Sequence, residues 1–467
     1  MAQRIEHKCM CRLISVSLVL SLFGCPGPGA VQRPPEERPV AKTTGGSQEQ
    51  SVHQEPEPSP APTLQAEQSR QEHQSPTPFE FRAAWVTRWD WQDAEDIEQI
   101  IADLATSGFN AVYFQVRGAA DAYYRSKIVP WASRLAGKLG ADPEWDPLQV
   151  AIDSARRHGI ELHAWFNACT AWKGEKRPGP STPPHMAREH PEWLVRGRDG
   201  KPLRGAGGYL FFNPAIPAFR KHILSVVAEL VSFYHLDGLH LDYIRYPAAE
   251  SSYDRIGLRS WKLARRNTPG LDLATFERRR LTELVKEIKT TVHEIRPGCE
   301  VSAAVFGIWK NRWGWENVIQ GYVDFHQDSH GWAKARALDT LVPMLYWPPA
   351  KKRGARTDFN FLAEDFLSLA GKVRLVAGIR ADKVSFAQFE RQLRTLRQSG
   401  WAGVALFSYR LLVRQGWLEK LRSGPFSAPA LTRPPEPQAA QTTARPSASQ
   451  KAQSKLSAGS TTAMRAR

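Results

Sequence analysis

The feature that most constrains the fold is an eightfold alternation between short apolar runs and amphipathic segments. The runs have the length and the β-branched and aromatic content of strands, and the segments between them repeat apolar residues at helical spacing. Phe219, Ile223 and Val226 illustrate that spacing, and several such segments end at a glycine just before the next run. The expected strands are 81–89, 111–116, 161–167, 238–244, 300–307, 340–347, 373–379 and 403–409.

Strands that alternate with helices pair in parallel, because each helix crosses over the sheet and returns the chain to the same edge. Eight such units close into a barrel, so we predict an α/β fold, a (β/α)8 TIM barrel, over residues 79–422. The length beyond a typical barrel lies in three βα loops, 118–146, 168–218 and 247–271. Loops after strands surround the C-terminal face, where barrel enzymes hold their active sites.

The residues on either side of this segment have the composition of solvated tails. All 16 Trp fall within 79–422, whereas 26–78 is rich in Pro, Gln, Glu and Ser and is predicted to be a disordered linker. Residues 423–467 are similar but carry six Lys and Arg against one acid, so we predict a basic disordered tail. Contact with an anionic polymer or lipid, or solubility alone, would both explain that charge.

The first 25 residues have the pattern of an export signal. Basic residues precede an apolar run, 13–23, that is too short to span a bilayer. Leu22-Phe23-Gly24-Cys25 resembles the bacterial lipobox, whose cysteine is lipidated after cleavage. We therefore expect Cys25 to anchor the protein to a membrane in the bacterial cell envelope, facing the periplasm or the exterior. An ordinary signal peptide cleaved nearby is the alternative.

Cysteine count and the expected export argue against two classes of protein. Three of the five cysteines lie in the signal, which leaves Cys169 and Cys299 and rules out a disulfide framework; we expect two buried thiols. The net charge of +16 fits a nucleic-acid partner, but export from the cytoplasm argues against one. We predict no nucleic-acid binding.

Polar residues gather at the ends of the expected strands, beginning with Asp242 in GLHLDYIRYP. A buried carboxylate costs several kcal/mol unless it is paired, so it is either held by partners or kept for chemistry. Side chains near the C-terminal ends of barrel strands point into the site. The candidates are Gln115, Arg117, His163, Trp165, Asn167, His240, Asp242, Arg245 and Tyr346.

Strand alternation places His240 and Asp242 on one face, and His163, Trp165 and Asn167 on one face of the neighbouring strand. The two histidines could instead form a satisfied hydrogen-bond layer inside the barrel. A zinc site made of His163, His240 and Asp242 is a further alternative, but no HxH or HExxH spacing supports it. We predict no metal and no cofactor.

Tryptophans follow many of the same strands, and sugar rings stack their apolar faces on such side chains. Those at strand ends or in the loops after them are Trp85, Trp89, Trp91, Trp165, Trp309, Trp313, Trp315, Trp332 and Trp347. So many on one rim suggest a carbohydrate ligand, although a single Trp is more often part of a core.

Several motifs together resemble the glycosyl-hydrolase-like 10 family over roughly residues 79–421. They include FRAAWVTRWDW, NAVYFQVR, HAWFN, DGLHLDYIRYP, VFGIWKNR and LVPMLYW. The resemblance implies a TIM-barrel envelope protein, and the family includes a lipoprotein that cleaves peptidoglycan glycan strands stripped of their stem peptides. It places the family's acids at Asp242 and at Asp328. Many relatives have a second acid where this chain has Tyr243, and Asn-Pro where it has Asn167-Ala168.

Glycoside hydrolysis needs two carboxyl groups around an oxocarbenium-like transition state. The predicted pair is Asp242 and Asp328, with Asp121 and Asp324 in reserve, and Asp328 could instead cap the following helix. The predicted substrate contacts are Gln115, Arg117, His163, Trp165, Asn167, His240, Arg245, Trp309, Tyr346 and Trp347. A lipoprotein that binds glycan without cleaving it is the alternative function.

Overall fold

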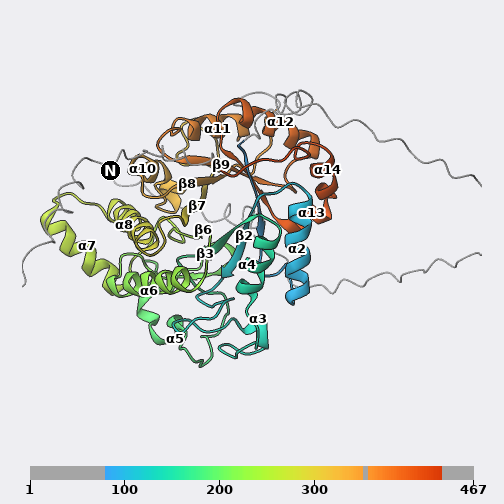
Figure 1. The fold of residues 1–467 in the computed structure, drawn as a ribbon. Helices are drawn as coiled ribbons and strands as arrows, with labels where there is room; N and C mark the ends of the chain where they lie inside the picture. Colours follow the sequence, from blue (N-terminus) through green and yellow to red (C-terminus); the bar gives the residue numbers. More distant parts are fainter. Residues whose placement is uncertain (1–78, 351–355, 434–467) are drawn as a thin grey trace, which may run out of the picture. The chain divides into compact units, whose positions relative to one another are not determined.

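Eight parallel strands close into a barrel in the computed structural model, which describes residues 79–350 and 356–433 (Figure 1). Each expected strand is a strand of this barrel, so the predicted TIM barrel is confirmed. In order around it they are β1 (Phe81–Val86), β10 (Gly403–Phe407), β9 (Arg374–Arg380), β8 (Thr340–Met344), β7 (Glu300–Phe306), β6 (Gly238–Asp242), β3 (Glu161–Asn167) and β2 (Ala111–Arg117). The expected signal, the linker and most of the basic tail lie outside the described residues.

Helices follow the strands and cover the barrel. They are α2 (Ala94–Thr106), α4 (Pro147–Arg157), α6 (Pro217–Phe233), α8 (Leu273–Ile295), α9 (Gly321–Asp324), α10 (Ser329–Lys334), α11 (Phe359–Leu367), α12 (Phe386–Gln398), α13 (Tyr409–Arg414) and α14 (Trp417–Ser423). Local sequence sets their starts: Asp93 and Asp146 accept backbone N–H groups at the first turns of α2 and α4, and Ser385 forms a capping box with Gln388 at α12.

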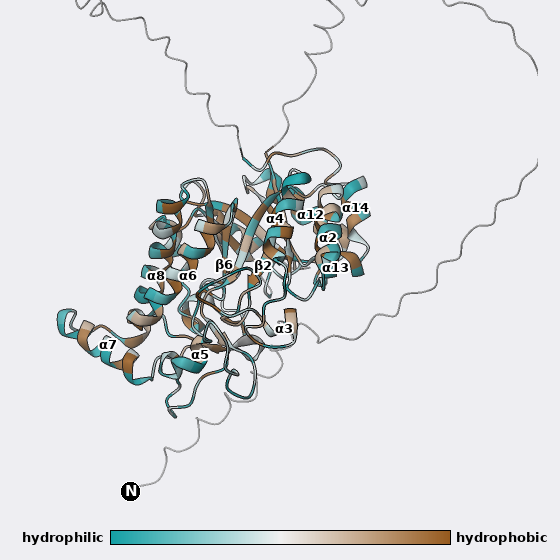
Figure 2. Ribbon diagram, turned by 60° about the horizontal axis from the view of Figure 1, so that its bottom comes forward, coloured by the Kyte–Doolittle hydropathy of each residue, from teal (hydrophilic) through white to brown (hydrophobic). Residues whose placement is uncertain are grey.

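The core has two layers, one between helices and strands and one inside the barrel. Helices α2, α6, α8 and α12 carry hydrophobic and hydrophilic residues on the same helix (Figure 2), and α2 buries Ile97, Ile100, Ile101 and Leu104. Inside the barrel Phe81, Trp85, Tyr113 and Trp165 form a separate apolar cluster. Large aromatic side chains thus fill the interior.

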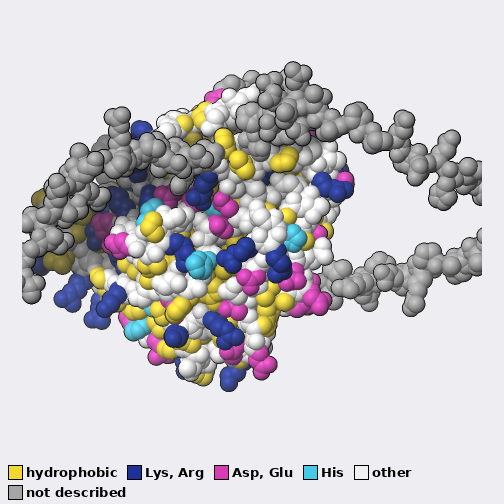
Figure 3. Space-filling view, viewed as in Figure 1, with side chains coloured by type: hydrophobic (Ala, Val, Ile, Leu, Met, Phe, Trp, Pro, Cys, Tyr) yellow, Lys and Arg dark blue, Asp and Glu magenta, His cyan; other side chains and the backbone are white. Residues whose placement is uncertain are grey.

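The three long βα loops carry structure of their own. They contain α3 (Ser133–Ala136), the antiparallel pair β4 (Thr170–Trp172) and β5 (Leu210–Phe211), α5 (Met186–Glu189), the 3-10 turns η2 (Pro191–Trp193) and η3 (Ala206–Gly208), and α7 (Arg255–Asn267). Helix α7 exposes Arg255, Arg259, Lys262, Arg265 and Arg266. Lys and Arg side chains project from the surface where α7 lies (Figure 3).

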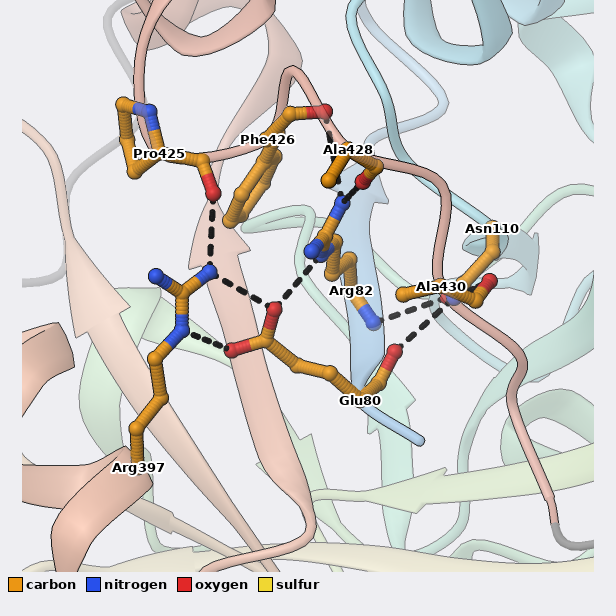
Figure 4. A network of polar contacts seen from close by, with 8 residues as sticks. All are labelled: Glu80, Arg82, Asn110, Arg397, Pro425, Phe426, Ala428 and Ala430. Atoms are coloured by element: carbon orange, nitrogen blue, oxygen red, sulfur yellow. Dashed lines mark hydrogen bonds and ion pairs between the residues drawn. The ribbon is translucent and has the colours of Figure 1, made fainter. Parts of the chain in front are cut away.

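The chain after α14 returns to the N-terminal face of the barrel and binds the residues around β1 (Figure 4). Arg82 donates to the carbonyl oxygens of Phe426 and Ala428. The backbone N–H of Glu80 donates to the carbonyl oxygen of Leu431. The Glu80 carboxylate also pairs with Arg82 and Arg397. Residues 424–432, which composition assigned to the tail, therefore lie against the barrel, beyond the expected boundary at 422.

Cys169 and Cys299 are both fully buried and form no disulfide, as expected from the sequence. Within 79–350 and 356–433, no helix combines the length and the apolar character that crossing a bilayer requires.

Candidate active site

An open cleft of about 160 Å³ lies at the C-terminal ends of the barrel strands. Aromatic side chains form much of its wall: Trp85, Trp89, Trp165, Tyr209, Tyr243, Tyr346 and Phe407. They come from strands β1, β3 and β10, from the chain just after β1, β6 and β8, and from the loop between β4 and β5. Of the three long loops, 168–218 thus adds residues to the cleft lining, whereas 118–146 and 247–271 add none.

Asp242 is the last residue of β6 and lines this cleft. Its Oδ1 accepts the backbone N–H of Tyr243 at 2.6 Å and lies 3.5 Å from a terminal nitrogen of Arg245, and its Oδ2 accepts Trp165 Nε1–H at 3.2 Å. Burial raises the pKa of Asp242, although Arg245 and the two N–H donors oppose that shift. A carboxyl group with a raised pKa is suited to proton donation.

Backbone geometry at the next residue helps to place the carboxylate. Tyr243 has a φ of +48°, a left-handed conformation that is uncommon for an aromatic residue. It ends the strand two residues earlier than the sequence suggested and lets Tyr243 N–H bond the preceding side chain. Arg245 then packs over the rings of Tyr243 and Phe306, at 4.2 and 5.0 Å.

The cleft is basic. Its cationic lining residues are Arg88, Lys173, Arg245, Arg380, Arg410 and Arg414, and its two carboxylates are Asp242 and Asp90. Asp90 accepts the backbone N–H of Thr87 at 2.7 Å and pairs with Arg410 at 3.1 Å. Burial raises the pKa of Asp90 against these contacts. With more cations than acids, the cleft is suited to an anionic ligand.

Asn167 and Gln115 also line the cleft, as predicted. Asn167 donates to the carbonyl of Gly118 at 3.1 Å, and among the described residues its buried Oδ1 has no hydrogen-bond partner. Gln115 Oε1 accepts the backbone N–H of Arg88. Arg117 is different: it is fully buried outside the cleft and donates to the Asn167 carbonyl at 2.6 Å, so it positions Asn167.

The predicted substrate contacts of His240 and His163 are wrong. His240 lies beneath the cleft floor, where its Nε2 accepts Trp85 Nε1–H at 3.1 Å and its Nδ1 donates to Ser302 at 2.9 Å. It stacks on Tyr113 at 3.8 Å, and burial together with His163 lowers the pKa of His240 well below its usual value. His163 is deeper still and lies 3.0 Å from Glu161. The two histidines therefore belong to a layer inside the barrel, which was the alternative to substrate contact.

These contacts also argue against zinc binding by His163, His240 and Asp242. Nδ1 of His240 carries the proton that it donates to Ser302, and the lone pair on its Nε2 accepts from Trp85, so no lone pair is free for a metal. In the described part of the chain no three His, Cys, Asp or Glu residues cluster as a metal site would require.

Asp328 does not line the cleft. Its Oδ1 accepts the backbone N–H of Gly331 and Trp309 Nε1–H, both at 3.0 Å, so its carboxylate caps α10. Trp309 stacks on His330 at 4.1 Å, and neither Trp309 nor Trp347 lines the cleft. The predicted substrate contacts of these two partly exposed tryptophans therefore stay predictions.

The reserve acids Asp121, in a loop, and Asp324, at the end of α9, also bond to nearby backbone N–H groups. Asp121 Oδ1 accepts the backbone N–H groups of Gly118 and Ala119, and Asp324 accepts that of Gln320. Neither belongs to the cleft lining. Trp165, Arg245 and Tyr346 do line it, as expected.

Sequence reasoning missed several lining residues, above all Arg88, Asp90, Lys173 and Tyr209. Arg88 and Asp90 follow β1, and the cluster TRWDW directly after an apolar strand was a usable indication. Lys173 and Tyr209 come from the β4–β5 insertion, whose folding back over the cleft has no sequence pattern comparable to strand alternation.

Known proteins that resemble this chain also point to a glycoside hydrolase. A family model described as Glycosyl hydrolase-like 10 matches residues 80–393. The chain is 29% identical over 298 residues to glycosyl hydrolase DigH of Escherichia coli K12, covering 57% of this chain and 66% of that protein. It is 27% identical over 294 residues to glycosyl hydrolase YngK of Bacillus subtilis 168, covering 57% and 54%. It thus spans between about half and two thirds of the length of these relatives.

Two solved structures share the fold. The glycoside hydrolase domain of PgaB (BpsB) from Bordetella bronchiseptica superposes with a TM-score of 0.51 at 15% identity, over 73% of this chain and 98% of that one. The catalytic domain of β-amylase from Paenibacillus polymyxa gives 0.54 at 13% identity, over 77% and 100%. At such identities the likeness concerns the barrel alone.

Proposed function

The chain belongs to the glycosyl hydrolase-like 10 family, and from that premise we propose that it is a glycosidase that cleaves peptidoglycan glycan strands lacking stem peptides. The observation that carries the proposal is a buried carboxyl group, Asp242, in a basic cleft walled by aromatic side chains. Aromatic walls suit sugar rings, and cations suit a glycan that bears carboxylates.

Asp242 acts as the general acid in this proposal. Its proton passes to the glycosidic oxygen as the bond from that oxygen to the anomeric carbon breaks and its electron pair stays on the oxygen. The raised pKa keeps more of Asp242 protonated near neutral pH than an exposed aspartate would be. Arg245 and Trp165 fix the orientation of the carboxyl group.

Asp90 takes the role of the second carboxylate, in place of Asp328. Among the described lining residues it is the other acid, and it follows β1, which is separated from β6 by β2 and β3 around the barrel. A sugar ring between the two walls would have one carboxyl group on each side. Asp90 then either takes a proton from the attacking water or attacks the anomeric carbon itself. Both roles need its ionised form, which the Thr87 N–H and Arg410 stabilise against the effect of burial.

The substrate assignment rests on the charge of the cleft. Muramic acid residues carry lactyl groups, and removal of the stem peptides leaves each of these with a free carboxylate. The six cationic lining residues complement such a strand better than they complement an uncharged glycan. The cell wall is therefore the proposed partner.

We also propose that the protein is an envelope lipoprotein held to the membrane through Cys25, with the barrel facing the periplasm or the exterior. The support is the basic, apolar and lipobox-like order of residues 1–25. A tether of this kind would keep the barrel near the glycan that it cleaves.

Digestion of amidase-treated peptidoglycan tests the proposal. We expect the protein to release sugar fragments without peptide, which are identified by mass. It should release far fewer fragments from peptidoglycan that keeps its stem peptides. Tight binding to the strands without any fragment would instead identify a glycan-binding protein, and neither binding nor cleavage would refute the proposal.

A further inference from the structure

We propose that Arg88, Tyr209 and Lys173 form a subsite for the lactyl carboxylate of the glycan, which makes the cleft select carboxylate-bearing strands over uncharged ones. The inference rests on the proposed function, because it names the part of the substrate that this wall of the cleft recognises. It concerns specificity and leaves the bond-breaking step to the carboxyl groups.

Arg88 is a buried cation that faces the cleft. Arg88 is 4% exposed, and among the described residues its guanidinium bonds to the neutral phenol of Tyr209 and forms none of the ion pairs found there. Asp121 acts on Arg88 only at longer range, and its Oδ1 is already bonded to two backbone N–H groups. A buried guanidinium without an anionic partner is unfavourable, so the site is set up to accept an anion.

The local structure holds Arg88 in place from several sides. Its guanidinium donates to Tyr209 Oη at 2.6 Å and lies 4.8 Å from the ring of Trp89. Gly118 gives it room: a Cβ there would lie 2.4 Å from the central guanidinium carbon. A side chain fixed in this way loses little conformational entropy when a ligand binds.

Tyr209 and Lys173 complete the subsite from the β4–β5 insertion. Because Tyr209 Oη accepts from Arg88, its own O–H can donate to a ligand oxygen. Lys173 Nζ lies 5.5 Å from the centre of the Tyr209 ring, and Lys173 is exposed at the cleft mouth. The three groups offer only donors toward a ligand, two of them charged, which is the pattern that a carboxylate requires.

The test compares two forms of the same peptide-free strands, one native and one whose lactyl carboxylates are converted to methyl amides. We expect the full-length protein to cleave native strands with a kcat/KM about 100-fold above that for amidated strands, since an unpaired buried charge weakens binding strongly. Arg88→Gln should bring that ratio close to one by losing activity on native strands. Lys173→Gln, on an exposed side chain, should reduce the ratio without disturbing the fold.

Arg394→Gln is the matched control, because Arg394 is an exposed arginine on α12, outside the cleft lining. It should leave the ratio unchanged. Equal cleavage of both substrates by the unmodified protein would overturn the subsite, and so would an Arg88→Gln variant that loses activity on both in equal proportion.

Equilibrium binding to the same strands separates this inference from the proposed function. If no substrate is cleaved but native strands bind more tightly than amidated ones through Arg88, the subsite stands and the glycosidase assignment fails. If neither form binds, the subsite fails as well.

Discussion

Asp242 lies where a buried strand meets the cleft, and its surroundings favour its uncharged form. The backbone N–H of Tyr243, Trp165 and Arg245 all stabilise the carboxylate, yet burial outweighs them and raises the pKa of Asp242. This balance gives substitution of Asp242 a defined outcome.

We expect Asp242→Asn to stay folded and to lose glycan cleavage by several orders of magnitude. Asparagine is nearly isosteric and carries no charge to bury, so the free energy of unfolding should change by less than about 1 kcal/mol. Melting temperature and turnover are measured on the same purified variant. A loss of about 3–5 kcal/mol, as when one partner of a buried ion pair is removed, would assign Asp242 a structural role instead.

The same variant gives a pH signature. Because the pKa of Asp242 is raised in the folded state, its stabilising contribution is fully present below the unfolded-state value of about 3.9 and is lost as pH rises through the folded-state value. Asp242→Asn lacks this titration. The melting temperature of the variant, relative to that of the unmodified protein, should therefore rise as pH rises through that window. Activity of the unmodified protein should fall at higher pH, where the acid form is depleted.

From the sequence, the residues that line the cleft could be predicted at the mouth of the barrel, but not in the layer beneath it. Alternation correctly put His163, Trp165 and Asn167 on one face, as it did His240 and Asp242. It did not say which layer faces substrate. Residues two apart on a strand differ by about 6.6 Å in depth, which separates cleft from interior. Asp328 presents a different ambiguity, since a helix cap, which the structure shows, and a catalytic acid use the same residue type.

At the scale of elements, the chain after α14 has a role that composition did not reveal. Residues 424–432 contribute mostly backbone carbonyls and one large apolar side chain, Phe426, which is 2% exposed. Phe426 packs edge-on against Phe109 with ring centres 5.3 Å apart, and Arg82 lies 4.7 Å from its ring centre. Contacts of this kind depend on the position of the segment in the folded protein, which its composition does not indicate.

We expect Phe426→Ala to lower the free energy of unfolding by about 3–5 kcal/mol, because it empties a buried aromatic site. Urea denaturation measures the change. Leu263→Ala, on a 60% exposed residue of α7, is the control and should shift stability by less than about 0.5 kcal/mol. If the two variants are equally stable, residues 424–432 add nothing to the folded unit.

Elements with a strong period were predictable, and those without one were not. All eight strands and the amphipathic helices α6 and α12 follow apolar spacing. The predicted strands extended too far where the backbone turns sharply, as at Tyr243. Strands β4 and β5, three and two residues long, are held together by contacts between residues distant in sequence. The insertion that contains them brings Lys173 and Tyr209 to the cleft.

For the whole molecule, two mechanisms could hold the protein at its substrate. A lipid on Cys25 acts through apolar burial and is insensitive to salt. Adhesion through the basic residues of the C-terminal tail and α7 acts through charge and is screened at high ionic strength. The two therefore respond differently to salt and to substitution.

We expect Cys25→Ser to move the protein from the membrane fraction to a soluble fraction, because it removes the only atom that the lipobox-like sequence offers to lipid. A linker of the length of residues 26–78 would give the barrel a reach of about 40 Å if it behaves as a flexible coil. Cys11→Ser, a cysteine earlier in the same segment, is the control and should stay bound. A Cys25→Ser variant that remains on membranes through washes at 1 M salt, roughly where the Debye length falls to 3 Å, would place the anchor elsewhere.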